Sequence, residues 1–331
     1  MKKIFSIFNF QFSIPIAALL LFASCEVDFS PNAPWKEIPV IHCLLDQDDD
    51  TTWVRVEKCF LGEGNIYTYG AVSDSINYPK DSIIVRLLAF DYWGGCDTIP
   101  FTYTVTTRPD GQFASVAQPL YYSTDTLDGN KSYQLEVLHA SSGRIMASTD
   151  RIPLIRKTAE KLIREPANND IFRFVGRRGC HIVWDVMENA RLYQPLVRFY
   201  YAEDGDTLYV DLKCGSIPSG NGSSILSCNY SRDAFLSELY AQLKDDPNPK
   251  QYLKTVDIFI TACDENLHTY LTSLSSSSDN GREAYSNIHG GVGIFAARRT
   301  HLSRNYRADS SIISGSGYGL VYYLDSLDIG F

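Results

Sequence analysis

Residues 38–60 read IPVIHCLLDQDDDTTWVRVEKCF, and this stretch decides the fold class. An apolar run, 38–45, is followed by the acidic segment Asp46–Asp50 and by an alternating run, 53–60. Alternation with a period of two is typical of a half-buried strand. The stretch therefore predicts a β-hairpin with a long acidic turn, one face carrying Val54, Val56, Lys58 and Phe60, the other Trp53, Arg55, Glu57 and Cys59.

Short runs of the same kind recur after this hairpin, separated by turn sequences such as Pro109-Asp110-Gly111 and Ser142-Gly143. Many short strands with closely spaced turns indicate a β-sandwich. The chain also contains 21 Tyr and 17 Phe but 3 Met, a composition that favours strands. We expect a first β-sandwich domain over 36–155, with further strands at 82–90, 101–106, 132–138 and 144–148, and with Arg151-Ile152-Pro153 closing the unit.

Residues 156–170 show no regular period and are interpreted as a domain boundary. Beyond them, strand patterns alternate with two helical patterns, 235–243 and 267–274. The predicted class is mainly β, with two tandem immunoglobulin- or fibronectin-like sandwich domains and two short helices inserted in the second, 156–331. Its strands are expected at 181–186, 192–202, 207–212, 255–262, 292–296 and 319–324.

The N-terminus has the pattern of a secretory signal. Lys2 and Lys3 precede an uncharged stretch, 4–24, that ends in Ala23-Ser24 directly before Cys25. This order predicts a lipoprotein signal peptide over 1–24, lipid (diacylglycerol and palmitate) on Cys25, and a tether over 25–35. The alternative is an uncleaved membrane-spanning anchor, which the polar residues and the proline within the stretch disfavour.

The chain is acidic. Its formal net charge of -9 becomes -11 when Lys2 and Lys3 are removed with the signal. Such a surface repels phosphate backbones, so we do not expect a nucleic-acid partner.

The acidic turn could hold a cation, because calcium prefers clustered oxygen ligands. Asp46, Asp48 and Asp50 are the weak candidates. The segment lacks the glycine and the terminal glutamate of an EF-hand loop, so we interpret it as a turn and assign no metal.

The chain has eight cysteines, and seven remain for other roles if Cys25 is lipidated. Cys214 and Cys228 flank a Gly/Ser-rich segment and form a candidate disulfide in an oxidising compartment. Cys43 and Cys59, in neighbouring predicted strands, form a second candidate pair. For each pair the alternative is a small buried apolar residue.

Sequence motifs for catalysis are not found. The chain has no H-E-x-x-H, C-x-x-C or G-x-S-x-G, so we assign no catalytic residue and no cofactor. The segment 287–295, NIHGGVGIF, is glycine-rich but runs into a strand, so its glycines are interpreted as permitting a bulge or close backbone packing.

One tripeptide, Asp-Ser/Thr followed by a small aliphatic residue or Thr, occurs seven times, whereas roughly two occurrences are expected by chance. The plain interpretation is a turn that leads into a strand. Its hydroxyl residues are Thr51, Ser75, Ser82, Thr98, Thr126, Thr207 and Ser326.

The segments 267–274 (LHTYLTSL) and 286–297 (SNIHGGVGIFAA), with 132–153, resemble Bacteroidota lipoproteins of the domain-of-unknown-function 4249 family. The resemblance implies a two-part β-sandwich anchored to the outer membrane, on its periplasmic or cell-surface face, beside a TonB-dependent receptor. It implies no catalytic residues. It also implies O-glycosylation at the seven hydroxyl residues above.

Three functions follow from these expectations. The favoured one is an accessory lipoprotein that is not an enzyme and that binds a ligand or partner through loops such as 62–78 and 215–229. The alternative is a structural or adhesive envelope protein, in which the sandwiches act as spacers. A secreted hydrolase is the least favoured, because no triad or metal set emerges.

Overall fold

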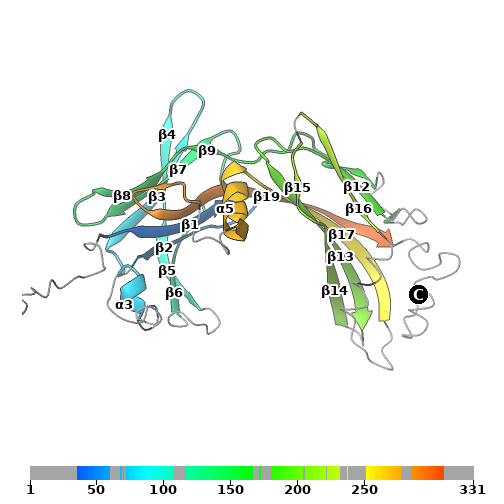
Figure 1. Cartoon of the computed structure of the whole chain (residues 1–331), viewed down its shortest axis with the longest axis horizontal. Helices are drawn as coiled ribbons and strands as arrows, with labels where there is room; N and C mark the ends of the chain where they lie inside the picture. The colour runs from blue at the N-terminus through cyan, green and yellow to red at the C-terminus, as the bar shows by residue number, and fades with distance from the viewer. Residues whose placement is uncertain are drawn as a thin grey trace, which may run out of the picture. The chain divides into compact units, whose positions relative to one another are not determined.

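Strands make up nearly all the regular structure of the described residues (Figure 1). The helices among the described residues are α3 (Ser73–Ile76) and α5 (Glu265–Ser276), and neither is long and apolar enough to cross a membrane. The computed structural model describes residues 36–308, apart from 60–67, 69, 71, 108–116, 167–170, 173–179, 204–205, 221, 232–236, 238–250 and 277–284.

The predicted first hairpin is confirmed. Strand β1 (Pro39–Leu45) pairs antiparallel with β2 (Thr52–Lys58). Val54 and Val56 are buried and Trp53 is 44% exposed, as the alternation predicts. The acidic segment forms the turn between the two strands.

A six-stranded sheet holds most of the remaining first-half strands. Its alternating β3 positions Ile83, Val85, Leu87 and Ala89 are buried, which confirms the strand expected there. Strand β4 (Cys96–Pro100), which the sequence analysis did not predict, lies at one edge. The order is β18 (Ile288–His289), β8 (Ile145–Thr149), β7 (Ser132–His139), β3 (Ile83–Phe90) and β4, with β9 (Ile152–Pro153) paired to β7.

A ten-stranded sheet contains β1 and β2 together with strands from the second half of the chain. Two short strands, β11 (Ile171–Phe172) and β15 (Ile217–Pro218), pair with β19 and β13 outside the main path. The order along the path is β14 (Asp206–Lys213), β13 (Leu192–Glu203), β17 (Gln251–Cys263), β19 (Val292–Ala308), β1, β2, β6 (Ala117–Ser123) and β5 (Thr102–Thr107).

The long strand β19 joins the two halves of this sheet. Its residues 292–297 run parallel to β1, and from Arg298 onwards it pairs antiparallel with β17. The sequence predicts a strand only over 292–296 and gives no sign of a parallel partner 250 residues earlier. The strand is longer than expected because its polar second half, which has no hydrophobic alternation, is paired with β17.

A three-stranded sheet comprises β10 (Ile163–Glu165), β12 (Cys180–Asp185) and β16 (Ile225–Tyr230). Trp184 of β12 and Cys228 of β16 belong to the core. The interpretation of 215–229 as a contact loop is corrected, because residues 225–229 belong to β16 and pair with β12.

Most of the buried hydrophobic side chains of the three sheets belong to one core cluster. The fold is thus mainly β, with several sheets, and is consistent with the β-sandwich class. All described strands lie in one compact unit that begins at Glu37. The helix predicted over 267–274 is confirmed as α5. The predicted helix 235–243, apart from Ser237, and the predicted strand 319–324 lie outside the described residues.

Candidate functional site

The acidic turn after β1 binds two arginines of β19. Arg299 donates from Nε to Oδ2 of Asp48 at 2.8 Å and from Nη2 to Oδ1 at 2.9 Å. Arg298 donates from Nη2 to Oδ2 of Asp49 at 3.1 Å. The bidentate geometry of the first pair is the stronger kind of charged hydrogen bond. The turn therefore fixes β19 beside β1.

Asp46 lies beneath this ion-pair group, with its side chain 4% exposed. Its Oδ1 accepts the backbone N–H of Asp48 at 3.1 Å. Burial raises the pKa of Asp46 to about 6; the Asp48 N–H and Arg298 oppose the rise, and the nearby carboxylates of Asp49 and Asp48 add to it. The buried carboxyl thus takes up a proton more readily than an exposed one.

Of the weak cation candidates Asp46, Asp48 and Asp50, the first two take part in these contacts. A calcium ion would have to displace the Arg299 guanidinium from Asp48. Among the described residues there is no group of three or more His, Cys, Asp or Glu side chains that could hold a metal. The turn is built for ion pairing with β19.

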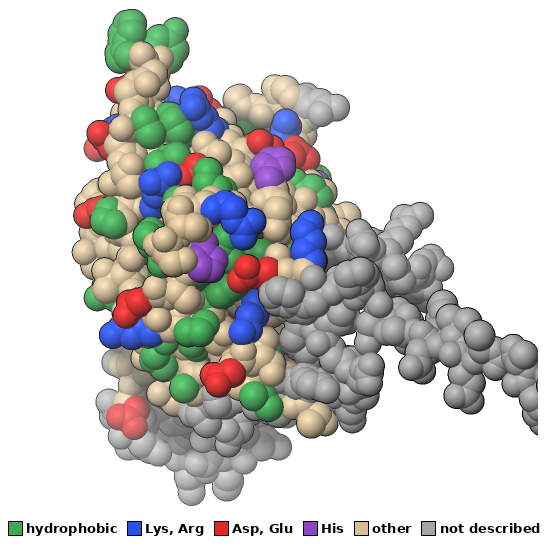
Figure 2. All heavy atoms as spheres, turned by 90° about the vertical axis from the view of Figure 1, so that its left-hand side faces the viewer, with side chains coloured by type: hydrophobic (Ala, Val, Ile, Leu, Met, Phe, Trp, Pro, Cys, Tyr) green, Lys and Arg blue, Asp and Glu red, His purple; other side chains and the backbone are tan. Residues whose placement is uncertain are grey.

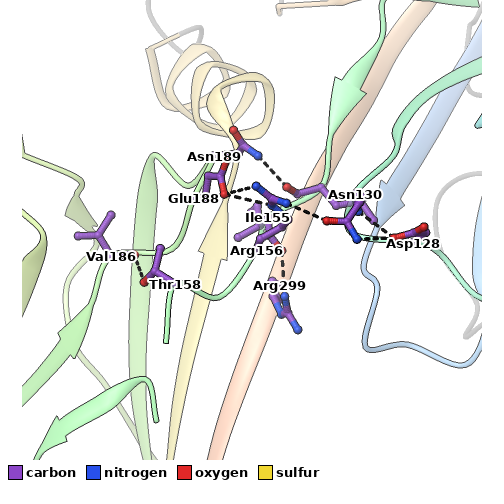
Figure 3. Close-up of polar contacts among 10 residues, drawn as sticks. Asp128, Asn130, Ile155, Arg156, Thr158, Val186, Glu188, Asn189 and Arg299 are labelled. Atoms are coloured by element: carbon purple, nitrogen blue, oxygen red, sulfur yellow. Dashed lines mark hydrogen bonds and ion pairs between the residues drawn. The ribbon is translucent and has the colours of Figure 1, made fainter. Parts of the chain in front are cut away.

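A second set of polar contacts fixes the connection 154–156 between β9 and β10 (Figure 3). Asn189 donates from Nδ2 to the Leu154 carbonyl at 2.9 Å, and Arg299 donates from Nη1 to the Ile155 carbonyl at 3.1 Å. Arg156 and Glu188 exchange two backbone hydrogen bonds, at 3.2 and 2.9 Å. The buried backbone of this connection is therefore paired by groups from distant elements.

The Arg156 side chain extends the same network. It bonds the Glu188 carboxylate, with 3.1 Å between Nε and Oε2, and donates from Nη1 to Asn130 Oδ1 at 2.9 Å. Asn130 in turn donates its backbone N–H to Asp128 Oδ1 at 2.9 Å. One guanidinium thus joins the loop before β7 to the loop after β12 (Figure 3).

Asp264 begins helix α5. Its Oδ1 accepts the N–H of Leu267 at 2.9 Å, which is an N-cap bond, and its Oδ2 accepts the N–H of Ala297 at 3.0 Å. The residue is 6% exposed. Burial raises the pKa of Asp264, and the hydrogen bonds from Leu267, Ala297 and Asn266 oppose that rise. Both carboxylate oxygens are engaged in holding the helix against β19.

The glycine-rich segment 287–295 packs closely on neighbouring backbone, as expected. Gly293 has φ +122°, and a Cβ there would overlap the carbonyl oxygen of Ile41. A Cβ on Gly290, which has φ +76°, would lie 2.6 Å from the Met146 carbonyl oxygen. Asn287 bonds Phe295 through both its amide atoms, at 2.7 and 2.9 Å. The segment is a tightly packed turn that leads from β18 into β19.

An open pocket of about 560 Å³ lies beside the first turn of α5. We call it the α5 pocket. Its volume is within the range of small-molecule sites. At its rim Arg191 and Glu265 form an ion pair of 2.8 Å, with both side chains more than half exposed. Its polar lining includes Arg151, Asn189, Arg191, Asp264, Glu265 and Asn266.

A second hollow, of about 530 Å³, contains His301. Burial lowers the pKa of His301 to about 4, with the charges of Lys157 and Arg299 adding to the effect and Asp48 opposing it. The imidazole is therefore uncharged at neutral pH. A separate histidine, His289, contacts Asp150 at 3.0 Å on the surface. The two histidines belong to different surroundings and form no shared site.

The predicted disulfides are not formed in this structure. Cys214 carries a free thiol, so it is not bonded to Cys228. Cys43 and Cys59 are also free thiols. Cys43 lies opposite Val54, whereas Cys59 follows the β2 residue paired with Pro39. The two cysteines are thus about 16 Å apart along the hairpin, at roughly 3.3 Å per residue, which is too far for a bond.

The hydroxyl residues of the Asp-Ser/Thr tripeptides occupy different environments. Thr51 and Ser82 directly precede β2 and β3, as the turn interpretation predicts, and are half-buried like Ser75. The Ser82 hydroxyl donates to the Pro79 carbonyl at 2.7 Å. Exposed positions are Thr98, Thr126 and Thr207, whereas Ser326 and the lipidation candidate Cys25 lie outside the described residues.

The residues that organise this region, namely Arg156, Asp264, Arg298 and Arg299, are not among those predicted from the sequence. Asp264 could have been found, because an aspartate directly before a helical pattern is an N-cap signal. The arginines carry no local signal of their partners.

Comparison with known proteins adds no family assignment. No protein-family model matches the chain, and no curated protein matches it in sequence.

Proposed function

We propose that this chain is a lipid-anchored protein of the outer membrane that binds a ligand or partner beside a TonB-dependent transporter and catalyses no reaction. The observation that carries the proposal is Cys25, preceded by a basic start, an uncharged stretch and Ala23-Ser24. This order directs lipid to the cysteine and the body of the protein to the membrane surface. We further propose that the body consists of two tandem immunoglobulin- or fibronectin-like sandwiches divided near residue 155.

The binding role is supported by the α5 pocket. It is open, ligand-sized and lined by charged and amide groups from three separate segments of the chain. Polar groups that converge on a hollow can orient a ligand. Arg191 and Glu265, which pair at the rim, are both exposed enough for either side chain to leave the other and bind a charged group of a ligand.

The absence of catalysis is supported by how the perturbed acids are used. Asp46 and Asp264 have raised pKa values because they are buried, and both bond backbone N–H groups of the fold. A catalytic acid needs such a shift together with access to substrate. Here the shifts accompany structural hydrogen bonds.

The proposed O-glycosylation would be easiest at exposed hydroxyls. Thr98 and Thr126 are exposed, whereas the Ser82 hydroxyl is engaged with the Pro79 carbonyl. We therefore expect glycan at Thr98 and Thr126 before Ser82.

Mass spectrometry of the mature N-terminus tests the anchor. We expect residues 1–24 to be absent and the mass of Cys25 to be raised by a diacylglycerol group and a fatty acyl chain. An intact Met1–Ser24 or an unmodified Cys25 would contradict the proposal.

Co-purification from outer membranes tests the partner. We expect a TonB-dependent β-barrel receptor to accompany the wild-type chain. Glu265→Arg, at the rim of the α5 pocket, should lower its recovery, whereas Glu160→Arg, an exposed glutamate of the other hollow, should not. Repeated failure to recover a receptor would favour the structural or adhesive role.

A further inference from the structure

The turn between β3 and β4 places two aromatic side chains in solvent. Tyr92 and Trp93 are each 89% exposed. Their rings stand edge to face, with 5.3 Å between centroids and an interplanar angle of 88°. Figure 2 shows hydrophobic side chains at the end of the projection that this hairpin forms. Exposed aromatic pairs of this size are unusual unless they make a contact.

The turn that carries the rings is well ordered by its own bonds. The Asp91 backbone N–H donates to the Gly95 carbonyl at 3.0 Å, and the Gly94 N–H donates to the Asp91 carbonyl at 3.3 Å. The Asp91 side-chain Oδ1 accepts the Gly95 N–H at 2.7 Å. Gly94 has φ +91°, a conformation that suits glycine. The rings are therefore presented on a preformed support, and their exposure is a built feature of the hairpin.

The base of the hairpin carries charges of both signs. Lys131 bonds the Asp97 carboxylate on one side. Arg151 lies 3.4 Å over the ring of Phe90, the last residue of β3. The tip itself bears no basic residue, and the Asp91 carboxylate is turned toward the Gly95 N–H. Two uncharged rings above a base that carries charges of both signs match the order of layers in a zwitterionic lipid surface.

The small area of the tip separates a lipid surface from a protein partner. Two aromatic side chains offer about 400 Å² together, at 150–250 Å² each. A stable protein interface needs about 800 Å² from each partner. In the adjoining strand β4 the exposed polar residues Asp97 and Thr98 separate Cys96 from the half-buried Ile99, so the strand adds little continuous apolar area to the tip. A bilayer imposes no such minimum, and Tyr and Trp are the residues enriched at its headgroup level.

We propose that the Tyr92–Trp93 tip inserts into the headgroup region of a zwitterionic phospholipid bilayer. This contact is separate from the lipid on Cys25 and would orient the body on the membrane to which the chain is anchored. The orienting role rests on the proposed anchoring, whereas the insertion itself does not. A weak insertion suffices for an anchored chain, because tethering gives the tip a high effective concentration at the surface.

Fluorescence quenching tests the insertion. The full chain is reconstituted with phosphatidylcholine vesicles whose acyl chains are brominated near the headgroup. We expect the wild-type emission to shift to shorter wavelength and to be partly quenched. Trp93→Phe should lose the quenched component, whereas Trp53→Phe, which removes another partly exposed tryptophan, should retain it. Equal quenching of the wild type and Trp93→Phe would overturn the proposal.

Other occupants give different results. If Tyr92→Ser/Trp93→Ser abolishes receptor co-purification while Trp93 stays unquenched by vesicles, the tip binds a protein and the proposal is overturned. If the same double variant converts a lipid-free dimer to a monomer, the tip binds a second copy, which also overturns it. The anchor is read separately from the mass of Cys25, so its failure is distinguishable from failure of the insertion.

Discussion

Two hairpin turns in the first half of the chain share a local device and differ in their surroundings. In the acidic turn Asp46 accepts the N–H of Asp48 at 3.1 Å, and in the aromatic turn Asp91 accepts the N–H of Gly95 at 2.7 Å. The acidic turn meets Arg298 and Arg299 of β19, whereas the aromatic turn points into solvent. Local turn chemistry therefore does not decide the role of a turn. The decisive factor is whether a distant strand supplies a partner.

The largest expected effect is the loss of the Arg299 guanidinium. Arg299→Met leaves the Asp48 carboxylate and the buried Ile155 carbonyl without their partner. We expect the free energy of unfolding in urea to fall by about 3 kcal/mol. The matched variant Arg298→Met removes a side chain that is 44% exposed and should cost less than about 1 kcal/mol. Similar losses of stability in both variants would mean that the Arg299–Asp48 pair does not hold β19 beside β1.

The next effect is a dependence on pH from Asp46. Burial raises its pKa in the folded chain from 3.8 to about 6. Between these values the folded chain holds a proton that the unfolded chain has released, so the Asp46 contribution to stability falls as pH rises through that window. Relative to the wild type, Asp46→Asn should gain up to about 2 kcal/mol between about pH 4 and pH 7. Urea unfolding at several pH values measures it, and a constant difference would refute it.

A smaller effect is expected from the backbone of the aromatic turn. Gly94 has φ +91° with open space around its Cα, so Gly94→Ala adds backbone strain without a clash. We expect a loss of about 1 kcal/mol in thermal unfolding. Gly215→Ala, which also meets open space but needs no positive φ, is the matched control and should stay within about 0.5 kcal/mol. Equal values for the two would indicate that the aromatic turn adapts freely.

The smallest effect is expected from the aromatic rings themselves. Tyr92→Ser/Trp93→Ser removes side chains that are each 89% exposed. Stability should change by no more than about 0.5 kcal/mol, because exposed side chains contribute little to folding. Thermal unfolding would detect a larger loss, and such a loss would show that the rings support the fold.

The strands of the first half were largely predictable because their side chains alternate. Val54 and Val56 on β2, and Val85 and Leu87 on β3, produce the period of two that a half-buried sheet requires. Strand β6 was missed because Pro119, which has no backbone N–H to donate to a neighbouring strand, interrupts its pattern. Strand β16 was missed because Ser227 and Asn229 resemble loop residues, although they are paired with β12.

The candidate site was much less predictable. The α5 pocket draws on four segments, near residues 151, 190, 219 and 265, which only the folded chain brings together. The sequence marks Asp46–Asp50 as acidic, but it does not show that Arg299, some 250 residues later, completes the turn. Such pairing depends on the parallel alignment of β1 with β19, and strand register of this range leaves no local trace.

Hydrogen–deuterium exchange compares the two turns most directly. In Arg299→Met we expect faster exchange in the acidic turn, in 154–156 and in β19 together, because one guanidinium bonds the first two to the third. In Tyr92→Ser/Trp93→Ser we expect those three segments to exchange as in the wild type. Faster exchange confined to β19 in the first variant, or faster exchange at the acidic turn in the second, would contradict the division of roles between the two turns.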